Sequence, residues 1–260
     1  MTMGTSRAWF ELKVFFRERE QVVFTFALPI LLLILFGTIF TGDVNGVAVS
    51  QLYTAGLVAA GVMSASFQNL GIAIAAEREA GGLKRLAGTP MPKHAYFTGK
   101  VLSVLVIAAV EAVLLLAAAV LLYGVKLPGE VGPWLTFCWV FALGLTATCL
   151  MGVAISGLPR SAKGASAVVT LPFLVLQFIS GVYIVPYTQL PGWLIDFASI
   201  FPLRWMCQGF RSVFLGDAGA VLEPSGSYDL DRVALVLAAW VVGGLVLCLL
   251  TFRWKSRREG

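Results

Sequence analysis

Side chains that could take part in chemistry are few in this sequence and lie far apart. His94 is the single histidine, and the four cysteines show no paired close spacing, so several histidines cannot build a metal site within one chain. The motifs GxxxxGK(S/T), HExxH and GxSxG, which cradle phosphates, bind zinc and present a nucleophilic serine, are absent from the sequence. We therefore expect no catalytic residue, no bound metal ion and no bound cofactor in this chain.

One acid, Glu111, lies inside a long apolar run. A charge at the centre of a membrane-spanning helix costs at least about 2.5 to 3.5 kcal/mol, so this carboxyl group must face protein, find a partner or hold a proton. It is either a contact for a substrate or a proton, or a neutral acid whose hydrogen bond packs two helices together. The amides of Asn69 and Gln177, in other apolar runs, are attributed to hydrogen bonds between helices.

Membrane-spanning helices are the elements that must carry these groups. Of the 260 residues, 58% are hydrophobic and 13% are charged, whereas soluble domains carry about a quarter charged residues. A span needs about 20 mostly apolar residues, and the six segments that qualify are Val22–Phe40, Leu52–Ala76, Val101–Tyr123, Leu135–Leu158, Ala165–Ile184 and Val233–Trp254. We predict an all-α integral membrane protein with six transmembrane helices, in which residues 1–260 form a single transmembrane domain.

The positive charges predict how these spans are oriented. Fifteen of the 19 lysines and arginines fall on one side of a six-span arrangement, and these residue types are enriched in cytoplasmic loops. Both termini are therefore expected in the cytoplasm, as an even number of spans requires. Because membrane topology accounts for the net charge of +5, we expect no nucleic-acid partner.

The N-terminal stretch Trp9–Glu20 alternates aromatic and charged residues. Trp9, Leu12 and Phe16 share one face of a helix. The segment is either an amphipathic helix lying in the cytoplasmic interface, with Trp9 at headgroup depth, or a flank that only sets topology.

The loop between the second and third expected spans is the most charged part of the chain. Leu83 and Leu86 are one helical turn apart, with Lys84 and Arg85 between them. A short helix here would be ended by the prolines that follow. It would expose the apolar side chains of Leu83 and Leu86 among charged residues. Such a helix suits docking into a groove on a cytosolic partner; the alternative is a solvated loop whose charges only set topology.

The loop before the last span is apolar and aromatic, yet Pro and Gly interrupt it too often for it to span a membrane. Two short helices separated at Pro202 fit best, dipping into the outer leaflet and returning. Arg204, Gln208 and Arg211 share a face of the second helix. They either contact lipid headgroups or an anionic substrate, or they snorkel as interfacial anchors.

Three segments of unusual composition are more specific together than any one is alone. They are the acidic-then-glycine stretch Glu77–Lys100, with Thr89-Pro90 and Tyr96-x-x-Gly99-Lys100; Ser180-Gly181 with Pro186, Leu190-Pro191 and Trp193; and Pro202-Leu203 followed by Arg211. In this order on six spans, they resemble the permease (transmembrane) subunits of type-2 ATP-binding-cassette (ABC) transporters. The closest resemblance is to bacterial drug-resistance exporter permeases of the daunorubicin-exporter kind.

The resemblance implies roles for particular segments. The N-terminal stretch would be an interfacial connecting helix, and Leu190–Leu215 would be a re-entrant helical hairpin on the outer side. The implied residues for coupling to an ATPase are Glu79, Gly81, Gly82, Leu83, Lys84, Arg85 and Leu86. Those implied for the hairpin are Pro191, Trp193, Pro202, Arg204 and Arg211.

The resemblance also implies partners and a location. Two permeases, identical or related, would work with two copies of a cytosolic nucleotide-binding ATPase subunit, and ATP and Mg²⁺ would bind in that partner. The chain would lie among the lipids of the bacterial plasma (inner) membrane and form the path for a hydrophobic or amphipathic substrate.

Two other classes of protein stay open as alternatives. A secondary transporter or channel would work without ATP and would use Glu111 near the midplane. A membrane enzyme acting on lipids would need at least two catalytic groups, and His94, Glu77 and Glu79 match no known spacing.

Overall fold

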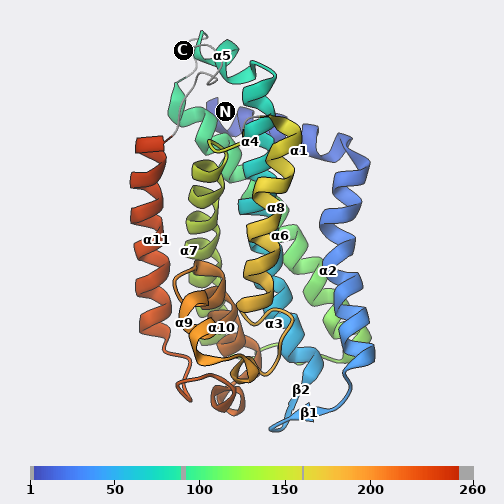
Figure 1. The fold of residues 1–260 in the computed structure, drawn as a ribbon. Helices are drawn as coiled ribbons and strands as arrows, with labels where there is room; N and C mark the ends of the chain where they lie inside the picture. Colours follow the sequence, from blue (N-terminus) through green and yellow to red (C-terminus); the bar gives the residue numbers. More distant parts are fainter. Residues whose placement is uncertain (1–2, 89–91, 160, 252–260) are drawn as a thin grey trace.

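The apolar runs fold into long helices that stand side by side (Figure 1). The computed structural model describes residues 3–88, 92–159 and 161–251. Its long helices are α2 (Arg19–Ile39), α6 (Lys93–Tyr123), α7 (Val131–Ile155), α8 (Ala162–Ile179) and α11 (Leu230–Thr251), with a continuous run of α3 (Val49–Met63), the π-helical segment η1 (Ser64–Asn69) and α4 (Leu70–Glu79).

Five helical stretches of the described chain are long and apolar enough to cross a membrane, and they match five of the six predicted spans. They are Arg19–Ile39, Val49–Glu79, His94–Tyr123, Val131–Ile155 and Leu230–Leu250. The other predicted span falls on α8, which ends at Ile179 rather than Ile184 because Gly181 takes a left-handed φ of 78°. Its apolar part, Lys163–Ile179, is shorter than a usual span, so the count of six stays a prediction.

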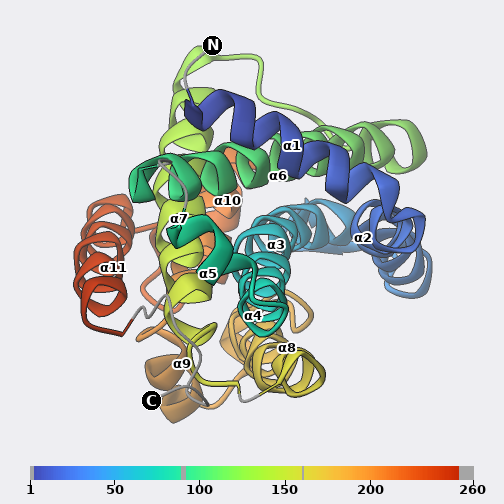
Figure 2. The ribbon, with the colours of Figure 1, turned by 90° about the horizontal axis from the view of Figure 1, so that it is seen from above.

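Helix α3 lies at the centre of the bundle. Every residue from Leu52 to Met63 is buried, which is typical of a helix covered on all sides. The covering elements are α2, α6, α7 and the short helix α10 (Pro202–Leu215). The view along the bundle shows α6 and α8 on opposite sides of this central helix (Figure 2).

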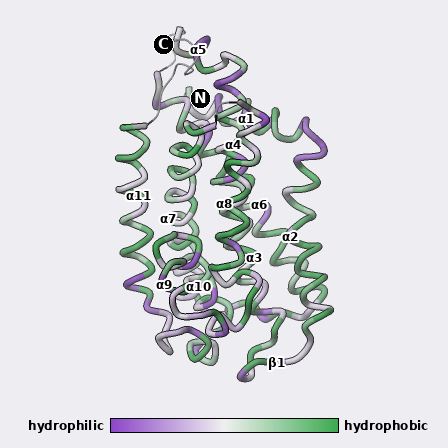
Figure 3. The backbone as a smooth tube through the Cα atoms, viewed as in Figure 1, coloured by the Kyte–Doolittle hydropathy of each residue, from purple (hydrophilic) through white to green (hydrophobic). Residues whose placement is uncertain are grey.

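One end of the bundle carries two further helices. Helix α1 (Met3–Arg17) lies across this end over α6, and α5 (Gly82–Ala87) projects from it (Figures 1 and 2). Gly4, Ala8 and Phe15 form the buried side of α1, whereas Trp9 and Phe16 are exposed. Hydrophobic residues cover the long helices and hydrophilic ones gather towards the ends, most clearly around α1 and α5 (Figure 3).

The opposite end carries short elements. They are the antiparallel strands β1 (Asp43–Val44) and β2 (Val47–Ala48), the helical turn η2 (Tyr187–Gln189), the helices α9 (Gly192–Ala198) and α10, and the turn η3 (Asp217–Leu222). Asn45 and Gly46 both have positive φ, 53° and 77°, as the tight turn of a two-residue hairpin requires. This Asn-Gly signal was present in the sequence and was missed.

Some expected features lie outside the described residues. These are the Thr89-Pro90 pair of the family resemblance, Arg160, and the C-terminal basic residues Arg253, Lys255, Arg257 and Arg258.

Candidate functional site

The expected coupling segment is a sharp turn followed by a short helix. Helix α4 ends at Glu79, and Gly81, with a left-handed φ of 70°, directs the chain into α5. Gly82 packs closely on the preceding turn, since a Cβ atom there would lie 3.1 Å from the carbonyl oxygen of Glu77. Glycine is therefore needed at the two positions for different reasons. Gly81 permits the left-handed turn, and Gly82 permits the close approach to the backbone of Glu77.

The expectation that both leucines of this helix are exposed is wrong. The Leu83 side chain is 1% exposed and belongs to the hydrophobic core, and Leu86 is half-buried against it. Lys84 and Arg85 are the exposed residues. The short helix folds its apolar side onto the end of the bundle and presents its charged side outward, so a partner would meet the cations rather than the leucines.

A network of charged residues lies beneath this helix. The Glu77 carboxylate accepts hydrogen bonds from the Tyr96 hydroxyl, at 2.8 Å, and from the Lys100 ammonium. Lys100 also donates to Glu11 at 2.7 Å, and Arg7 pairs with Glu11. This coupling network, defined as these five residues, joins α1, α4 and α6.

The coupling network explains three residues of the Tyr96-x-x-Gly99-Lys100 motif. Tyr96 and Lys100 bind Glu77, while Gly99 lies where α1 crosses α6, and a Cβ atom there would lie 2.5 Å from the Arg7 side chain. The contributions of Arg7 and Glu11 were missed, although their spacing of four residues is that of a helical ion pair.

The residues considered for a lipid enzyme, Glu77, Glu79 and His94, lie in different surroundings. Glu77 is engaged by Tyr96 and Lys100, whereas His94 and Glu79 are exposed. Within the part of the chain that the structure describes, no group of three or more His, Cys, Asp or Glu side chains could hold a metal ion.

Polar contacts also cross the middle of the bundle. The Ser66 hydroxyl of η1 lies 2.6 Å from that of Thr148 on α7. Asn69 donates to Thr25 of α2 at 3.4 Å, which confirms a hydrogen bond between helices for this residue. Gln177 instead accepts a hydrogen bond from Tyr183, in the turn that follows its own helix, which differs from the expected bond between helices.

Glu111 is buried without a partner. Its side chain is 3% exposed, and neither carboxyl oxygen has a hydrogen-bond partner among the described residues. It packs against α3 at Gly61, where a Cβ atom would lie 2.6 Å from one carboxyl oxygen. The expected helix-packing hydrogen bond is therefore not found. Nothing among the described residues compensates a charge at this position, where an uncompensated ion would be far more costly than a neutral acid.

Arg211 is the centre of the outer hairpin. It is 2% exposed and forms a two-pronged ion pair with Glu223, with one N–H···O distance of 3.1 Å. It also donates to the carbonyl oxygen of Gly181 at 3.4 Å. One side chain thus connects α10 with the end of α8 and with the segment after η3.

Arg204 is likewise enclosed by protein. It is 5% exposed, and its guanidinium lies 5.0 Å from the centre of the Tyr187 ring and 4.6 Å from that of Trp205. Burial raises the pKa of Tyr187 to about 12, although the nearby arginines oppose this shift, so the phenol stays neutral. The snorkelling alternative is wrong for these two arginines, because aromatic rings enclose Arg204, while Glu223 and the carbonyl oxygen of Gly181 bind Arg211.

The other hairpin residues lie where the sequence suggested. Pro202 is the first residue of α10, where a missing N–H group costs nothing. Pro191 precedes α9, and Trp193 within it is 71% exposed.

The family follows from a comparison with known proteins. The family model described as "ABC-2 type transporter" matches residues 6–215. This chain belongs to the ABC-2 type transporter family. The match contains the coupling network, Glu111 and Arg211, and it confirms the resemblance deduced from the sequence.

Two curated relatives of this family member carry the name "Probable multidrug ABC transporter permease YbhR", one from Escherichia coli K12 and one from Escherichia coli O157:H7. Each is 26% identical over 147 residues, which are 56% of this chain and 39% of the relative. The match therefore spans about two fifths of the length of these relatives. As a family member with several helices suited to crossing a bilayer, the chain is a multi-pass membrane protein.

Proposed function

We propose that this chain is the membrane-spanning permease subunit of an ATP-driven exporter, powered by a separate cytosolic ATPase subunit. The coupling network carries this proposal. Lys84 and Arg85 are exposed at the tip of the molecule, and Glu77, just before the turn into α5, is bonded to α1 and α6. A partner that moves α5 would therefore act on α1 and α6 as well as on α4.

In this proposal, the partner subunits bind and hydrolyse ATP. Two ATPase subunits would hold ATP and Mg²⁺, and their cycle would switch a pair of permeases between inward-open and outward-open states. The second permease is an identical or related chain. Large apolar side chains are exposed on α2 and α8, among them Phe24, Leu31, Leu171 and Phe178, which suits a path for a hydrophobic or amphipathic substrate (a drug, a lipid or a lipid-linked molecule) between the two copies.

The proposal includes a topology. Helix α8 is the sixth span, α9 and α10 form the re-entrant hairpin in the outer leaflet, and both termini lie in the cytoplasm of a bacterial plasma (inner) membrane. Helix α1 and the last described turn of α11 lie at the same end of the bundle (Figure 1), which supports this topology.

With native cysteines removed, an impermeant thiol reagent added outside intact cells should label a cysteine at Trp193 and not one at Lys84; the reverse pattern would refute the topology.

Reversing the two exposed charges tests the coupling role. The variant Lys84→Glu/Arg85→Glu should lose the ATPase from the purified complex, because like charges brought together across an interface cost several kcal/mol. Both side chains are exposed, so the free energy of unfolding should change by less than about 1 kcal/mol. Lys126→Glu, an equally exposed change at the other end, is the control and should keep the ATPase. A charge-reversed variant that keeps both its ATPase and its transport would rule out docking through α5.

A second candidate function rests on Glu111. A buried acid without a partner is the kind of group that a proton-coupled transporter needs, so an ATP-independent transporter is the alternative. If ATP drives transport, Glu111→Gln should transport at the rate of the unmodified chain, since a neutral acid and its amide are similar in shape and both uncharged. Transport measured in proteoliposomes with and without the ATPase distinguishes the ATP-driven permease from the ATP-independent transporter. Activity that needs no ATPase and is lost in this variant would favour the alternative.

A further inference from the structure

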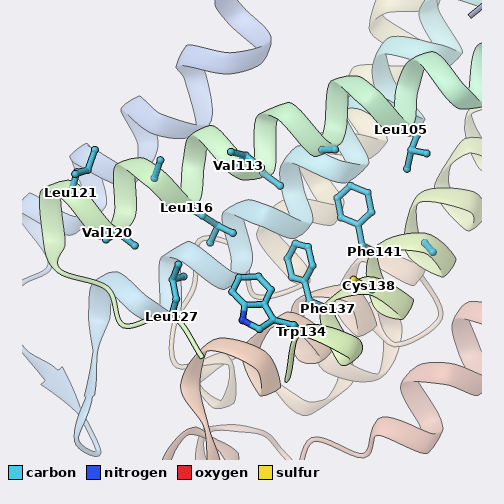
Figure 4. Close-up of a pocket in the computed structure, with 14 residues that line it drawn as sticks. Leu105, Val113, Leu116, Val120, Leu121, Leu127, Trp134, Phe137, Cys138 and Phe141 are labelled. Carbon is cyan, nitrogen blue, oxygen red and sulfur yellow. The ribbon is translucent and has the colours of Figure 1, made fainter. Parts of the chain in front are cut away.

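An apolar groove lies between α6 and α7 (Figure 4). These two consecutive helices separate towards the end of the bundle that carries α9 and α10 (Figure 1). Its volume is about 780 Å³, within the range of about 300 to 1,000 Å³ that is usual for ligand sites. Leu105 and Leu121 mark its extent along α6. Trp134 and Phe141 mark it along α7, and Leu127 of the connecting loop closes one end.

The lining allows only a hydrocarbon ligand. Almost all of its surface is contributed by aliphatic and aromatic side chains, and the most polar group on α7 besides the indole is the thiol of Cys138. The Trp134 indole N–H already donates to the carbonyl oxygen of Pro128 at 3.0 Å. A sugar, peptide or nucleotide would bury polar groups here without partners, which is costly.

Along α7 the groove is about as deep as one leaflet of a bilayer, whereas along α6 it runs from Leu105 to Leu121, about 24 Å at 1.5 Å per residue. The lining residues of α7 run from Trp134 to Ala142, about 12 Å at 1.5 Å per residue, and half of a hydrocarbon core of about 30 Å is about 15 Å. The loop end has the features of a headgroup region: Trp134 is a typical interfacial residue, and Lys126, next to Leu127, is exposed. Glu130 is the exposed acid of the same loop, so an anionic headgroup would favour the side of Lys126.

We propose that this groove binds one acyl chain of a phospholipid from the leaflet on the hairpin side, with the lipid phosphate near Lys126. The groove is lined by α6, α7 and Leu127 of the loop between them, whereas the proposed substrate path runs along α2 and α8, and α8 lies on the other side of α3 from α6 (Figure 2). The lipid site requires only that the helices lie in a bilayer, so it does not depend on the ATP-driven function.

Photo-crosslinking tests the site directly. The full chain is reconstituted with phosphatidylglycerol that carries a diazirine on its acyl chain, irradiated, digested and mapped by mass spectrometry. Crosslinks should concentrate on residues 105–121 and 134–142 and should be displaced by unlabelled phosphatidylglycerol. In Ala109→Phe/Ala142→Phe, which fills the groove, they should fall to the level found on α11. Ala239→Phe, an exposed alanine on α11, is the matched control and should keep them.

Several outcomes would overturn the proposal. Crosslinks spread evenly over the exposed faces of α2, α8 and α11 would mean ordinary lipid contact. Displacement by an amphipathic drug but not by phosphatidylglycerol would assign the groove to a substrate. If the filled variant does not fold, Cys138, which is exposed in the groove, gives the second test. Added phosphatidylglycerol should slow its reaction with an apolar maleimide in detergent, and an unchanged rate would contradict the proposal.

Discussion

Replacing Arg211 with alanine should destabilise the protein by about 3 to 5 kcal/mol, because it leaves the Glu223 carboxylate buried without its partner. Glu223 is 2% exposed, and the two residues form a two-pronged ion pair. The change also removes the link to Gly181 at the end of α8. Detergent-denaturation and thermal-stability measurements on the purified chain, followed by the fluorescence of its tryptophans, would report the loss.

Two variants separate this effect from a general loss of charge. Arg232→Ala removes an arginine that is 72% exposed and lies 3.7 Å from Asp229, and it should change stability by less than about 1 kcal/mol. The double variant Arg211→Met/Glu223→Leu should recover most of the stability, since apolar replacements of a buried pair are often neutral. If Arg211→Ala proves as mild as Arg232→Ala, the ion pair does not hold the hairpin together.

Gly152→Ala should destabilise the contact between α7 and η1 by about 1 to 3 kcal/mol, through overpacking. A Cβ atom at Gly152 would lie 2.8 Å from the carbonyl oxygen of Ser66 and 2.9 Å from that of Phe67. Both neighbours are backbone atoms, so a change of side-chain rotamer cannot relieve the contact. The nearby hydrogen bond between Ser66 and Thr148 should weaken as the helices separate.

Gly243→Ala is the matched control for this change. Gly243 also lies within a long helix, α11, but a Cβ atom there would meet nothing within 4 Å. Alanine should therefore gain up to about 1 kcal/mol from its better helix propensity. Equal stabilities of the two variants, compared in the same denaturation assay, would argue against close packing of α7 on η1.

Hydropathy alone located the long helices, because the bilayer demands apolar runs of a certain length. It was least accurate where a helix continues beyond the apolar run. Helix α6 begins at Lys93 rather than Val101, since Tyr96 and Lys100 satisfy their polar groups within the coupling network. The break at Gly181 shortened α8 in the same way, through a backbone conformation that hydropathy does not report.

The pairing of charged residues could not be predicted from the sequence. Arg211 and Glu223 are twelve residues apart across a change of direction, so no helical spacing relates them. Leu83 could not be distinguished from Leu86, since the two differ only in how α5 folds back on the bundle. The segments of unusual composition were nevertheless the right ones to examine, because each contains residues that join several helices.

Purification of the chain from its native membranes in mild detergent, with identification of every co-purified protein by mass and stoichiometry, tests the central claim most directly. We expect a soluble P-loop ATPase in an amount about equal to that of the chain, lost in Lys84→Glu/Arg85→Glu and kept in Lys126→Glu. Recovery of the chain alone, or only with further copies of itself, would contradict an ATP-driven permease and make Glu111 the next residue to test.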